Sequence, residues 1–182
     1  MQIMQLKITL LGIEPKIYRI VQVPSTITLR NLHKVIQRVM DWESYHLYQF
    51  VKDRQSIGPK SRDFDMAELQ NDKSVPVAEL LPKLRHKLHY EYDFGDGWLH
   101  EILLQNTLPA EEGVRYPVCI EGQHAGPPED SGGSPGYCDL LEALDDPTHE
   151  GYEDAREWLG EDFNPENFDI EEINARLRRI KV

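Results

Sequence analysis

The middle of the chain, residues 90–101, reads Tyr90-Glu91-Tyr92-Asp93-Phe94-Gly95-Asp96-Gly97-Trp98-Leu99-His100-Glu101. Asp96-Gly97 is a strong signal for a two-residue turn, because both central positions of a type I′ turn need a positive φ angle, which Asp and Gly tolerate. Apolar and aromatic residues flank this pair on both sides. The stretch therefore predicts an antiparallel hairpin between residues 88–94 and 98–104.

The position of the turn decides which residues face each other across the hairpin. A turn at residues 96–97 places Asp93 opposite His100, whereas a turn one residue earlier places Glu91 there. Either register brings a carboxylate to an imidazole, a pair that general acid–base catalysis or a divalent metal site uses. The alternative is a purely structural cross-strand pair, which stabilises a hairpin by about 0.2–1 kcal/mol.

The pattern around this hairpin predicts an α+β fold. Residues 6–11 and 17–23 favour two strands, Thr28 can cap a helix over 29–40, and 46–51 alternates like a strand. Residues 53–73 are polar and favour an exposed excursion with at most one helical turn near Met66. We expect a mixed, mainly antiparallel sheet of about five strands with one helix across a face, a β-grasp-like β-β-α-β start, and a helical C-terminal part.

The chain is expected to form one domain over residues 1–182. Its parts are an α/β sheet core at 1–108, an ordered Pro- and Gly-rich loop at 109–136 that wraps the sheet, and a helical extension at 137–182. The last helix opens at a capping box that begins with Asp169.

Composition limits the classes of function. The net charge is −12, made up of +2 over residues 1–100 and −14 over residues 101–182. Such an acidic field repels phosphate backbones, which argues against nucleic-acid binding. No apolar run approaches the roughly 20 residues that span a bilayer, and two cysteines are too few for a disulfide framework, so a cytoplasmic protein without a membrane anchor is expected.

Several motifs carry a family resemblance. They are Tyr92-Asp93-Phe94-Gly95-Asp96-Gly97-Trp98, then His100-Glu101, and Pro127-Pro128-Glu129-Asp130 ahead of Gly132-Gly133. With them, nearly the whole chain resembles the plasmid pRiA-type ORF-three-like family. Its members are largely uncharacterised, and some are labelled transposon passenger proteins or TnpR resolvases. The resolvase label gains no support from the residues, because the chain is acidic and Ser25 reads as a helix-capping residue rather than a nucleophile.

The resemblance also bears on metal binding. Related sequences carry three cysteines in the loop, which together with a histidine imply a thiolate metal site. Here Cys119 matches the first of them, while Gly126 and Ser131 replace the other two. A structural thiolate zinc site is therefore not expected in this chain, and its cofactors are unknown.

Two groups of residues are candidate sites. The first group forms a binding pocket if the loop folds over the hairpin end, and its residues are Asp93, Trp98, His100, His124, Glu129 and Asp130. Within this pocket, the candidates for catalysis are Asp93 and His100. The candidates for metal binding are Asp93, His100 and His124. The second group is a basic stripe at i, i+4 and i+8 of the first helix, Arg30, Lys34 and Arg38, which could follow a phosphate backbone or simply be solvated.

The favoured function is a noncatalytic, cytoplasmic module that binds a protein partner, with a link to mobile elements implied by the family labels. One alternative is a metal-dependent or acid–base enzyme that uses the Asp93/His100 pocket. The other is nucleic-acid binding through the Arg30/Lys34/Arg38 face. The sequence identifies neither the partner nor the oligomeric state.

Overall fold

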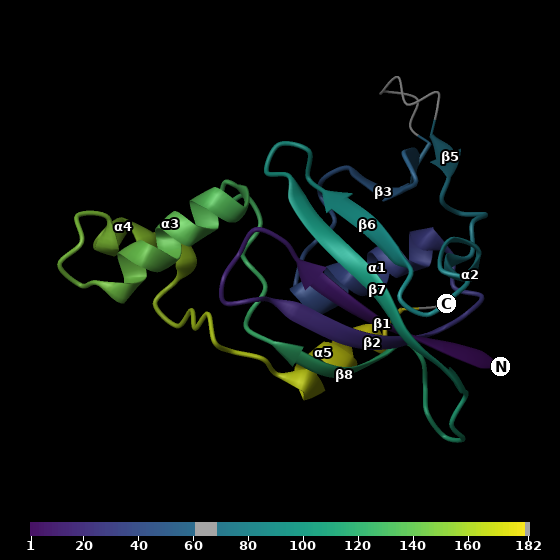
Figure 1. Ribbon diagram of the computed structural model, residues 1–182. Coiled ribbons are helices and arrows are strands. Elements are labelled where there is room, and N and C mark those ends of the chain that lie inside the picture. The colour runs from purple at the N-terminus through teal and green to yellow at the C-terminus, as the bar shows by residue number, and fades with distance from the viewer. Residues whose placement is uncertain (61–68, 181–182) are drawn as a thin grey trace.

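The computed structural model describes residues 1–60 and 69–180, and Figure 1 shows their arrangement. In chain order the strands are β1 Gln2–Leu10, β2 Tyr18–Pro24, β3 Tyr48–Lys52, β4 Gln55–Gly58, β5 Gln70–Asn71, β6 Lys87–Tyr92, β7 Trp98–Pro109 and β8 Val118–Gln123. The helices are α1 Leu29–Met40, α2 Val77–Leu80, α3 Gly133–Asp145, α4 Tyr152–Leu159 and α5 Ile170–Leu177. In this part of the chain, no helix has the length and apolar character that crossing a membrane requires. The helical turn expected at Met66 lies outside the described residues.

The strands form one sheet in the order β5-β4-β3-β6-β7-β1-β2-β8. Only the β4–β5 pair is parallel among the described strands, so the prediction of a mixed, mainly antiparallel sheet is confirmed. The strand number was wrong, since residues 1–60 and 69–180 alone contain eight strands where about five were expected. The expected β-β-α-β start is present, but the β-grasp detail does not match, because the strand on the other side of β1, β7, is antiparallel to it where a β-grasp sheet has a parallel strand.

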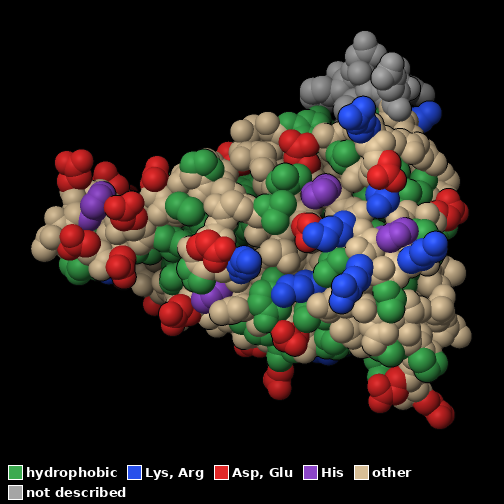
Figure 2. Space-filling model, in the orientation of Figure 1, with side chains coloured by type: hydrophobic (Ala, Val, Ile, Leu, Met, Phe, Trp, Pro, Cys, Tyr) green, Lys and Arg blue, Asp and Glu red, His purple; other side chains and the backbone are tan. Residues whose placement is uncertain are grey.

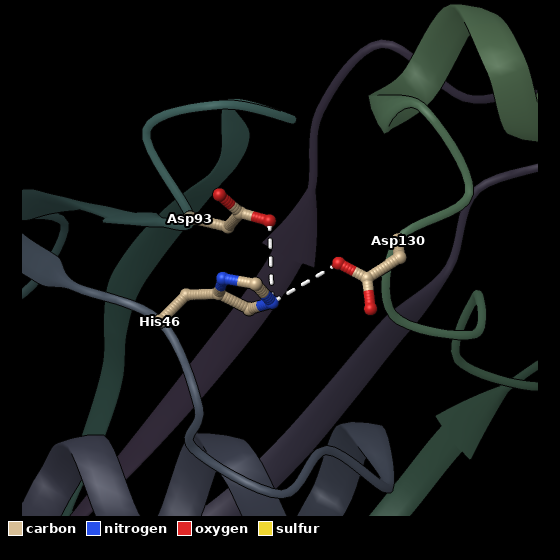
Figure 3. Close-up of side chains that lie close together, drawn as sticks. All are labelled: His46, Asp93 and Asp130. Atoms are coloured by element: carbon tan, nitrogen blue, oxygen red, sulfur yellow. Dashed lines mark ion pairs between the residues drawn. The ribbon is translucent and has the colours of Figure 1, made fainter.

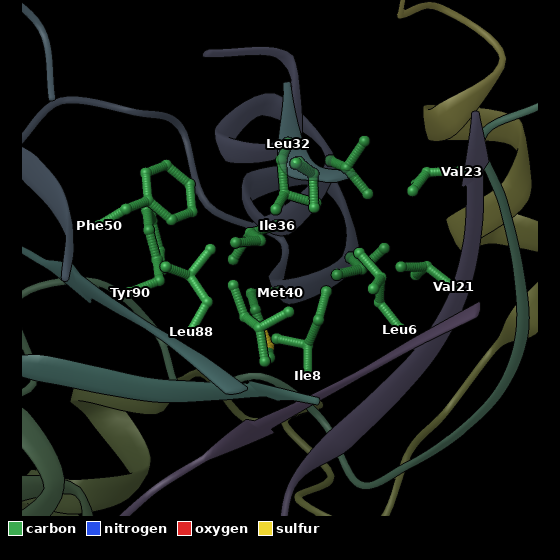
Figure 4. Close-up of a cluster of buried hydrophobic side chains, with 14 of the residues drawn as sticks. Leu6, Ile8, Val21, Val23, Leu32, Ile36, Met40, Phe50, Leu88 and Tyr90 are labelled. Atoms are coloured by element: carbon green, nitrogen blue, oxygen red, sulfur yellow. The ribbon is translucent and has the colours of Figure 1, made fainter. Parts of the chain in front are cut away.

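Helix α1 crosses one face of the sheet and supplies its core. The Thr28 side chain caps the helix by accepting a hydrogen bond from the Asn31 N–H, and Leu32, Ile36 and Val39 are all buried. Figure 4 shows Leu32, Ile36 and Met40 of α1 facing side chains of β1, β2, β3 and β6, including Leu6, Val21, Phe50 and Leu88. The prediction that this helix packs on the sheet is confirmed.

The β6–β7 hairpin pairs antiparallel as predicted, but in another register. Tyr92 faces Trp98 and Tyr90 faces His100, so the connection is a five-residue turn at 93–97 rather than a two-residue turn. Asp93 and Gly97 both have positive φ angles, and the Gly97 N–H donates to the Asp93 carbonyl at 2.6 Å. This register gathers the even-numbered aromatic and apolar residues of both strands on the buried face, which outweighs the local preference for a short turn.

The segment 109–136, expected as a loop, also contains strand β8, which extends the sheet beyond β2. Helix α5 covers the outer edge of β8. The Asn174 side chain accepts a hydrogen bond from the Cys119 N–H at 2.8 Å and donates to the Cys119 carbonyl at 2.9 Å. A side-chain amide therefore takes the place that a further strand would occupy.

Helices α3 and α4 project from the sheet to one side as an arm (Figure 1). Tyr137 anchors the arm by packing edge-on against Phe163, and the Ser134 hydroxyl donates to the Leu11 carbonyl at 3.0 Å. Figure 2 shows Asp and Glu side chains gathered on the arm, whereas Lys and Arg gather over the strands on the face turned toward the viewer. The acidic second half of the sequence thus places much of its negative charge on the arm, away from the Lys and Arg side chains over the strands.

Candidate functional site

Three side chains from distant parts of the chain meet where the β6–β7 turn lies against the loop before α3 (Figure 3). His46 precedes β3, Asp93 follows β6, and Asp130 lies between β8 and α3. His46 Nε2 is 3.2 Å from an Asp130 carboxylate oxygen and 3.6 Å from one of Asp93. The side chains of His46, Asp93 and Asp130 are 29%, 12% and 71% exposed, so the cluster extends from the end of the β6–β7 hairpin out to solvent.

Backbone contacts hold the inner carboxylate in place. The Asp93 N–H donates to the Leu47 carbonyl at 2.9 Å, and the Asp93 carboxylate accepts a hydrogen bond from the Gly95 N–H at 3.0 Å. Asp93 and Asp130 both adopt left-handed backbone conformations, with φ angles of 56° and 60°. Aspartate tolerates this region better than most residues, so the sequence permits both sharp turns that aim these carboxylates at His46.

The loop of residues 124–133 is fastened to the sheet at several points. The Trp42 indole donates to the Pro127 carbonyl at 2.7 Å, and the Glu129 carboxylate accepts hydrogen bonds from the Glu43 N–H and the Tyr92 hydroxyl. The Gly132 N–H donates to the Asp96 carboxylate at 3.1 Å. The prediction that the Pro127–Asp130 loop covers the hairpin end is therefore confirmed.

A buried arginine fixes the start of the same loop. The Arg19 guanidinium donates to the carbonyls of Val39, Tyr18, Gln123 and His124 at 2.7–2.9 Å. Burial lowers the pKa of Arg19 to about 10, so the group is still charged at neutral pH. Four carbonyl acceptors thus stabilise a cation at the point where β8 ends and the loop begins.

The predicted Asp93/His100 pair does not form. His100 faces Tyr90 in the hairpin and packs against Trp42 and Tyr90, with ring centroids 5.4 and 5.5 Å away. His100 is fully buried, and neither of its ring nitrogens has a hydrogen-bond partner among the described residues. Burial lowers its pKa to about 4, so His100 is a neutral core residue at pH 7.

The other predicted pocket residues separate into different roles. Trp98 is fully buried in the core, and the Glu129 carboxylate is engaged by Glu43 and Tyr92. His124 lines a different pocket of about 440 Å³, between the β1–β2 connection, α3 and the segment at Pro165. Of the predicted set, only Asp93 and Asp130 come together, and His46 takes the place expected for His100.

Sequence reasoning missed His46 because it was assigned only to the start of the strand expected over residues 46–51, whereas β3 begins at Tyr48. It falls between α1 and β3, flanked by the exposed Tyr45 and the half-buried Leu47. The hairpin register carried a signal for this residue. When the apolar side chains of both strands are placed on the same buried face, His100 points into the core and cannot contact Asp93. The Asp93 carboxylate then needs a partner from another strand. The strand that pairs with β6 on its other side is β3, and His46 lies just before it.

The basic stripe of α1 is divided between structure and solvent. Arg30 makes a two-pronged ion pair with Asp72, at 2.8 and 2.9 Å, and Asp72 is fully buried. The hydrogen bond to Asp72 raises the pKa of Arg30. Lys34 is exposed and Arg38 half-buried, so the three residues do not form one free row of cations.

Two neighbours on α1, His33 and Gln37, are buried in a polar network. His33 stacks on Tyr48 with ring centroids 3.6 Å apart, and its Nδ1 lies 2.7 Å from the Tyr90 hydroxyl. Gln37 donates to the same hydroxyl at 3.1 Å. Burial lowers the pKa of His33 to about 3, so this histidine is neutral at pH 7.

Gly126, one of the loop positions where the family resemblance implies a cysteine, has no room for a side chain. A Cβ atom on Gly126 would overlap the Met40 carbonyl oxygen. Cys119 is buried, and burial raises its pKa to about 11, which disfavours the thiolate form that binds zinc. The expectation that this chain lacks a structural thiolate zinc site remains a prediction.

Comparisons with known proteins identify the family. Residues 2–172 match the model of the Plasmid pRiA4b ORF-3-like protein family. A protein of Sinorhizobium fredii (strain NBRC 101917 / NGR234), called uncharacterized protein y4hQ, is 35% identical over 176 residues, which cover 96% of this chain and 90% of that protein. The crystal structure of the protein of unknown function MM3350 from Methanosarcina mazei Go1 is 42% identical, with a TM-score of 0.85, over 93% of this chain and 96% of that chain. This chain therefore belongs to the plasmid pRiA4b ORF-3-like protein family.

Proposed function

We propose that this protein is a noncatalytic cytoplasmic module that binds a basic segment of a partner protein. The binding face is the hairpin-end surface, defined as residues 43–46, 93–97 and 127–133. A link to mobile elements is supported by the plasmid in the family's name.

Two exposed aromatic side chains carry this proposal. Tyr45 is 76% exposed and Phe94 is 43% exposed, and they are the sequence neighbours of His46 and Asp93, whose side chains meet. Large aromatic side chains are costly to leave in water and supply much of the binding energy at protein interfaces. Both stand on backbone that is fastened to the sheet, so little conformational entropy would be lost when a partner binds.

The charge of the hairpin-end surface indicates the partner's chemistry. Its carboxylates are Glu43, Asp93, Asp96, Glu129 and Asp130, and its segments contain no Lys or Arg. An acidic rim around aromatic anchors is complementary to a segment rich in Lys and Arg.

The test is quantitative affinity capture from host lysate, with and without nuclease, using three forms of the chain. These are the unaltered protein, the Tyr45→Ala/Phe94→Ala variant, and a control, Leu84→Ala/Ile120→Ala, which removes two exposed apolar side chains outside the hairpin-end surface. We expect a partner that resists nuclease, is lost with the first variant and is kept by the control. With purified components, each aromatic truncation should weaken binding at least about tenfold. Capture that needs nucleic acid, or that both variants retain, would contradict the proposal.

The enzyme alternative loses His100 as its general base. A general base must reach a substrate proton, and His100 is fully buried with no carboxylate partner among the described residues. Nucleic-acid binding through α1 ranks last, because Arg30 is committed to Asp72.

A further inference from the structure

We propose that His46, Asp93 and Asp130 bind one divalent transition-metal ion, of the class to which Zn²⁺ belongs. This site is separate from any thiolate site suggested by the cysteines of related sequences, because it uses none of positions 119, 126 and 131. It lies within the hairpin-end surface and shares His46, Asp93 and Asp130 with it. Zn²⁺ titration and partner capture are separate measurements, so either proposal can fail while the other stands.

The spacing of the three ligand atoms fits an ion. A tetrahedral zinc site with bonds of about 2.0–2.2 Å separates neighbouring ligand atoms by about 3.4 Å. His46 Nε2 lies 3.2 Å from Asp130 Oδ1 and 3.6 Å from Asp93 Oδ2, and the three ligand atoms all lie within 4.8 Å of one another. Small side-chain adjustments bring all three within bonding distance of one centre.

The nitrogen at the centre of the cluster lacks a hydrogen bond. His46 Nε2 is shielded from solvent and has no hydrogen bond of acceptable geometry to any described residue, although two carboxylates approach it. Two carboxylates therefore approach a buried nitrogen that makes no hydrogen bond to either of them, and buried polar atoms normally have a partner. A bound metal ion would satisfy the nitrogen and both carboxylates together.

The ligand types select the class of ion. One imidazole with two carboxylates suits Zn²⁺ and its first-row neighbours, whereas Ca²⁺ and Mg²⁺ prefer sites made entirely of oxygen. Three protein ligands leave a coordination position for water or for a group of a bound molecule, as in open zinc sites. The exposed Asp130 also lines a groove of about 570 Å³ against α3 and α4, which gives access from solvent.

Binding would connect three separate segments of the chain. His46 belongs to the α1–β3 connection, Asp93 to the β6–β7 turn and Asp130 to the loop before α3. Because the unfolded chain does not hold these residues together, the ion binds the folded state and stabilises it.

The experiment is calorimetric titration of Zn²⁺ into the chelator-treated, full-length chain, together with thermal unfolding with and without Zn²⁺. We expect one ion per chain and a higher Tm with Zn²⁺. His46→Gln and Asp130→Asn should each weaken Zn²⁺ binding at least about tenfold, since even changes outside the ligands of metal sites cost 10–100-fold. Asp130→Asn keeps the size of the side chain and the tolerance for a positive φ angle, so this variant should fold.

The controls separate the site from the general acidity of the chain. His89→Gln alters an exposed histidine on β6, and Asp139→Asn alters an exposed aspartate that lines the same groove as Asp130. Both should bind Zn²⁺ like the unaltered chain. The proposal is overturned by absence of saturable Zn²⁺ binding, by binding that survives both site variants, by an equal loss in the controls, or by Mg²⁺ binding as tightly as Zn²⁺.

Discussion

Gly97 and Gly133 have nearly the same backbone conformation in different surroundings. Their φ angles are +68° and +69°. A Cβ atom on Gly97 would meet nothing within 4 Å, whereas one on Gly133 would overlap the Asp96 carbonyl oxygen. The two glycines therefore separate the cost of a left-handed conformation from the cost of close contact between the loop and the hairpin.

Replacing each glycine by alanine tests this separation. Gly97→Ala should lower the free energy of unfolding by about 1–2 kcal/mol, the cost of a positive φ angle for a residue with a Cβ atom. Gly133→Ala should lower it by about a further 1–3 kcal/mol, because the loop must move off the hairpin. Urea denaturation measures both changes. Equal losses would mean that the loop does not pack tightly on the β6–β7 turn.

The buried His100 makes stability depend on pH. Its pKa is about 4 in the folded protein, against about 6.5 for histidine in an unfolded chain. As the pH falls below about 6.5, the unfolded chain binds a proton that the folded state refuses, so stability is lost down to about pH 4.

We expect His100→Leu to remove this contribution. The variant should be as stable as the unaltered chain, or more so, at pH 7, because it replaces two unpartnered buried nitrogens by apolar atoms. Between pH 7 and pH 5 its loss of stability should be smaller by about 2 kcal/mol. Urea denaturation at the two pH values gives the comparison, with the exposed His89→Leu as control. Identical pH dependence in all three proteins would show that His100 takes up its proton in the folded state.

At the scale of elements, α1 is linked to the chain beyond β5 by a buried ion pair. Asp72 accepts two hydrogen bonds from Arg30 and one from the Tyr48 hydroxyl, and it is fully buried. Removing its cation would leave a buried charge without compensation, which costs far more than the loss of a surface pair.

Arg30→Met should therefore lower the free energy of unfolding by about 2–3 kcal/mol, whereas Lys34→Met, one turn later on the same helix, should change it by less than about 0.5 kcal/mol. Adding Asp72→Asn to Arg30→Met should restore part of the loss, because the unpaired charge is then gone. Chemical denaturation of the four proteins provides the cycle. An additive double variant would mean that the pair contributes nothing to stability.

The elements that could be predicted are those whose signal is local. The apolar stripe of α1 and its Thr28 cap are written in consecutive residues, and so is the alternation of β6 and β7. The hairpin register could have been predicted too, by weighing the buried aromatic face above the Asp96-Gly97 signal. Strand β8 could not, because its partner β2 is distant in sequence and its outer edge is closed by the side chain of Asn174.

The residues of the site could also be predicted only where their signal is local in the sequence. The proximity of Asp93 and Asp130 was predictable, because Asp93 lies at the end of the predicted hairpin and the loop that carries Asp130 was expected to fold over that end. His46 required one step more, because only the pairing of β3 with β6, which no local pattern specifies, brings it to the β6–β7 turn.

For the whole molecule, charge decides which partners can approach. The net charge of −12 is concentrated in the second half of the chain, much of it on the α3–α4 arm. We expect no saturable binding of labelled duplex or single-stranded DNA at physiological salt, because the field of the chain repels a polyanion. Fluorescence anisotropy is the direct measurement. Submicromolar binding that weakens in a Lys34→Ala/Arg38→Ala variant would restore the basic face of α1 as a nucleic-acid site.

The order of strands in the sheet also affects how the chain is made. Strand β1 lies between β2 and β7, and its residue Leu10 pairs with His100. At ribosomal rates of about 5–20 residues per second, β7 emerges on the order of 5 to 20 s after β1. During that interval both edges of the β1–β2 hairpin are unpaired, because β8, the second partner of β2, emerges later still. Unpaired strand edges can pair with other chains and aggregate. Slower translation of the chain between β1 and β7 should therefore lower the yield of this protein, because the two edges stay unpaired for longer.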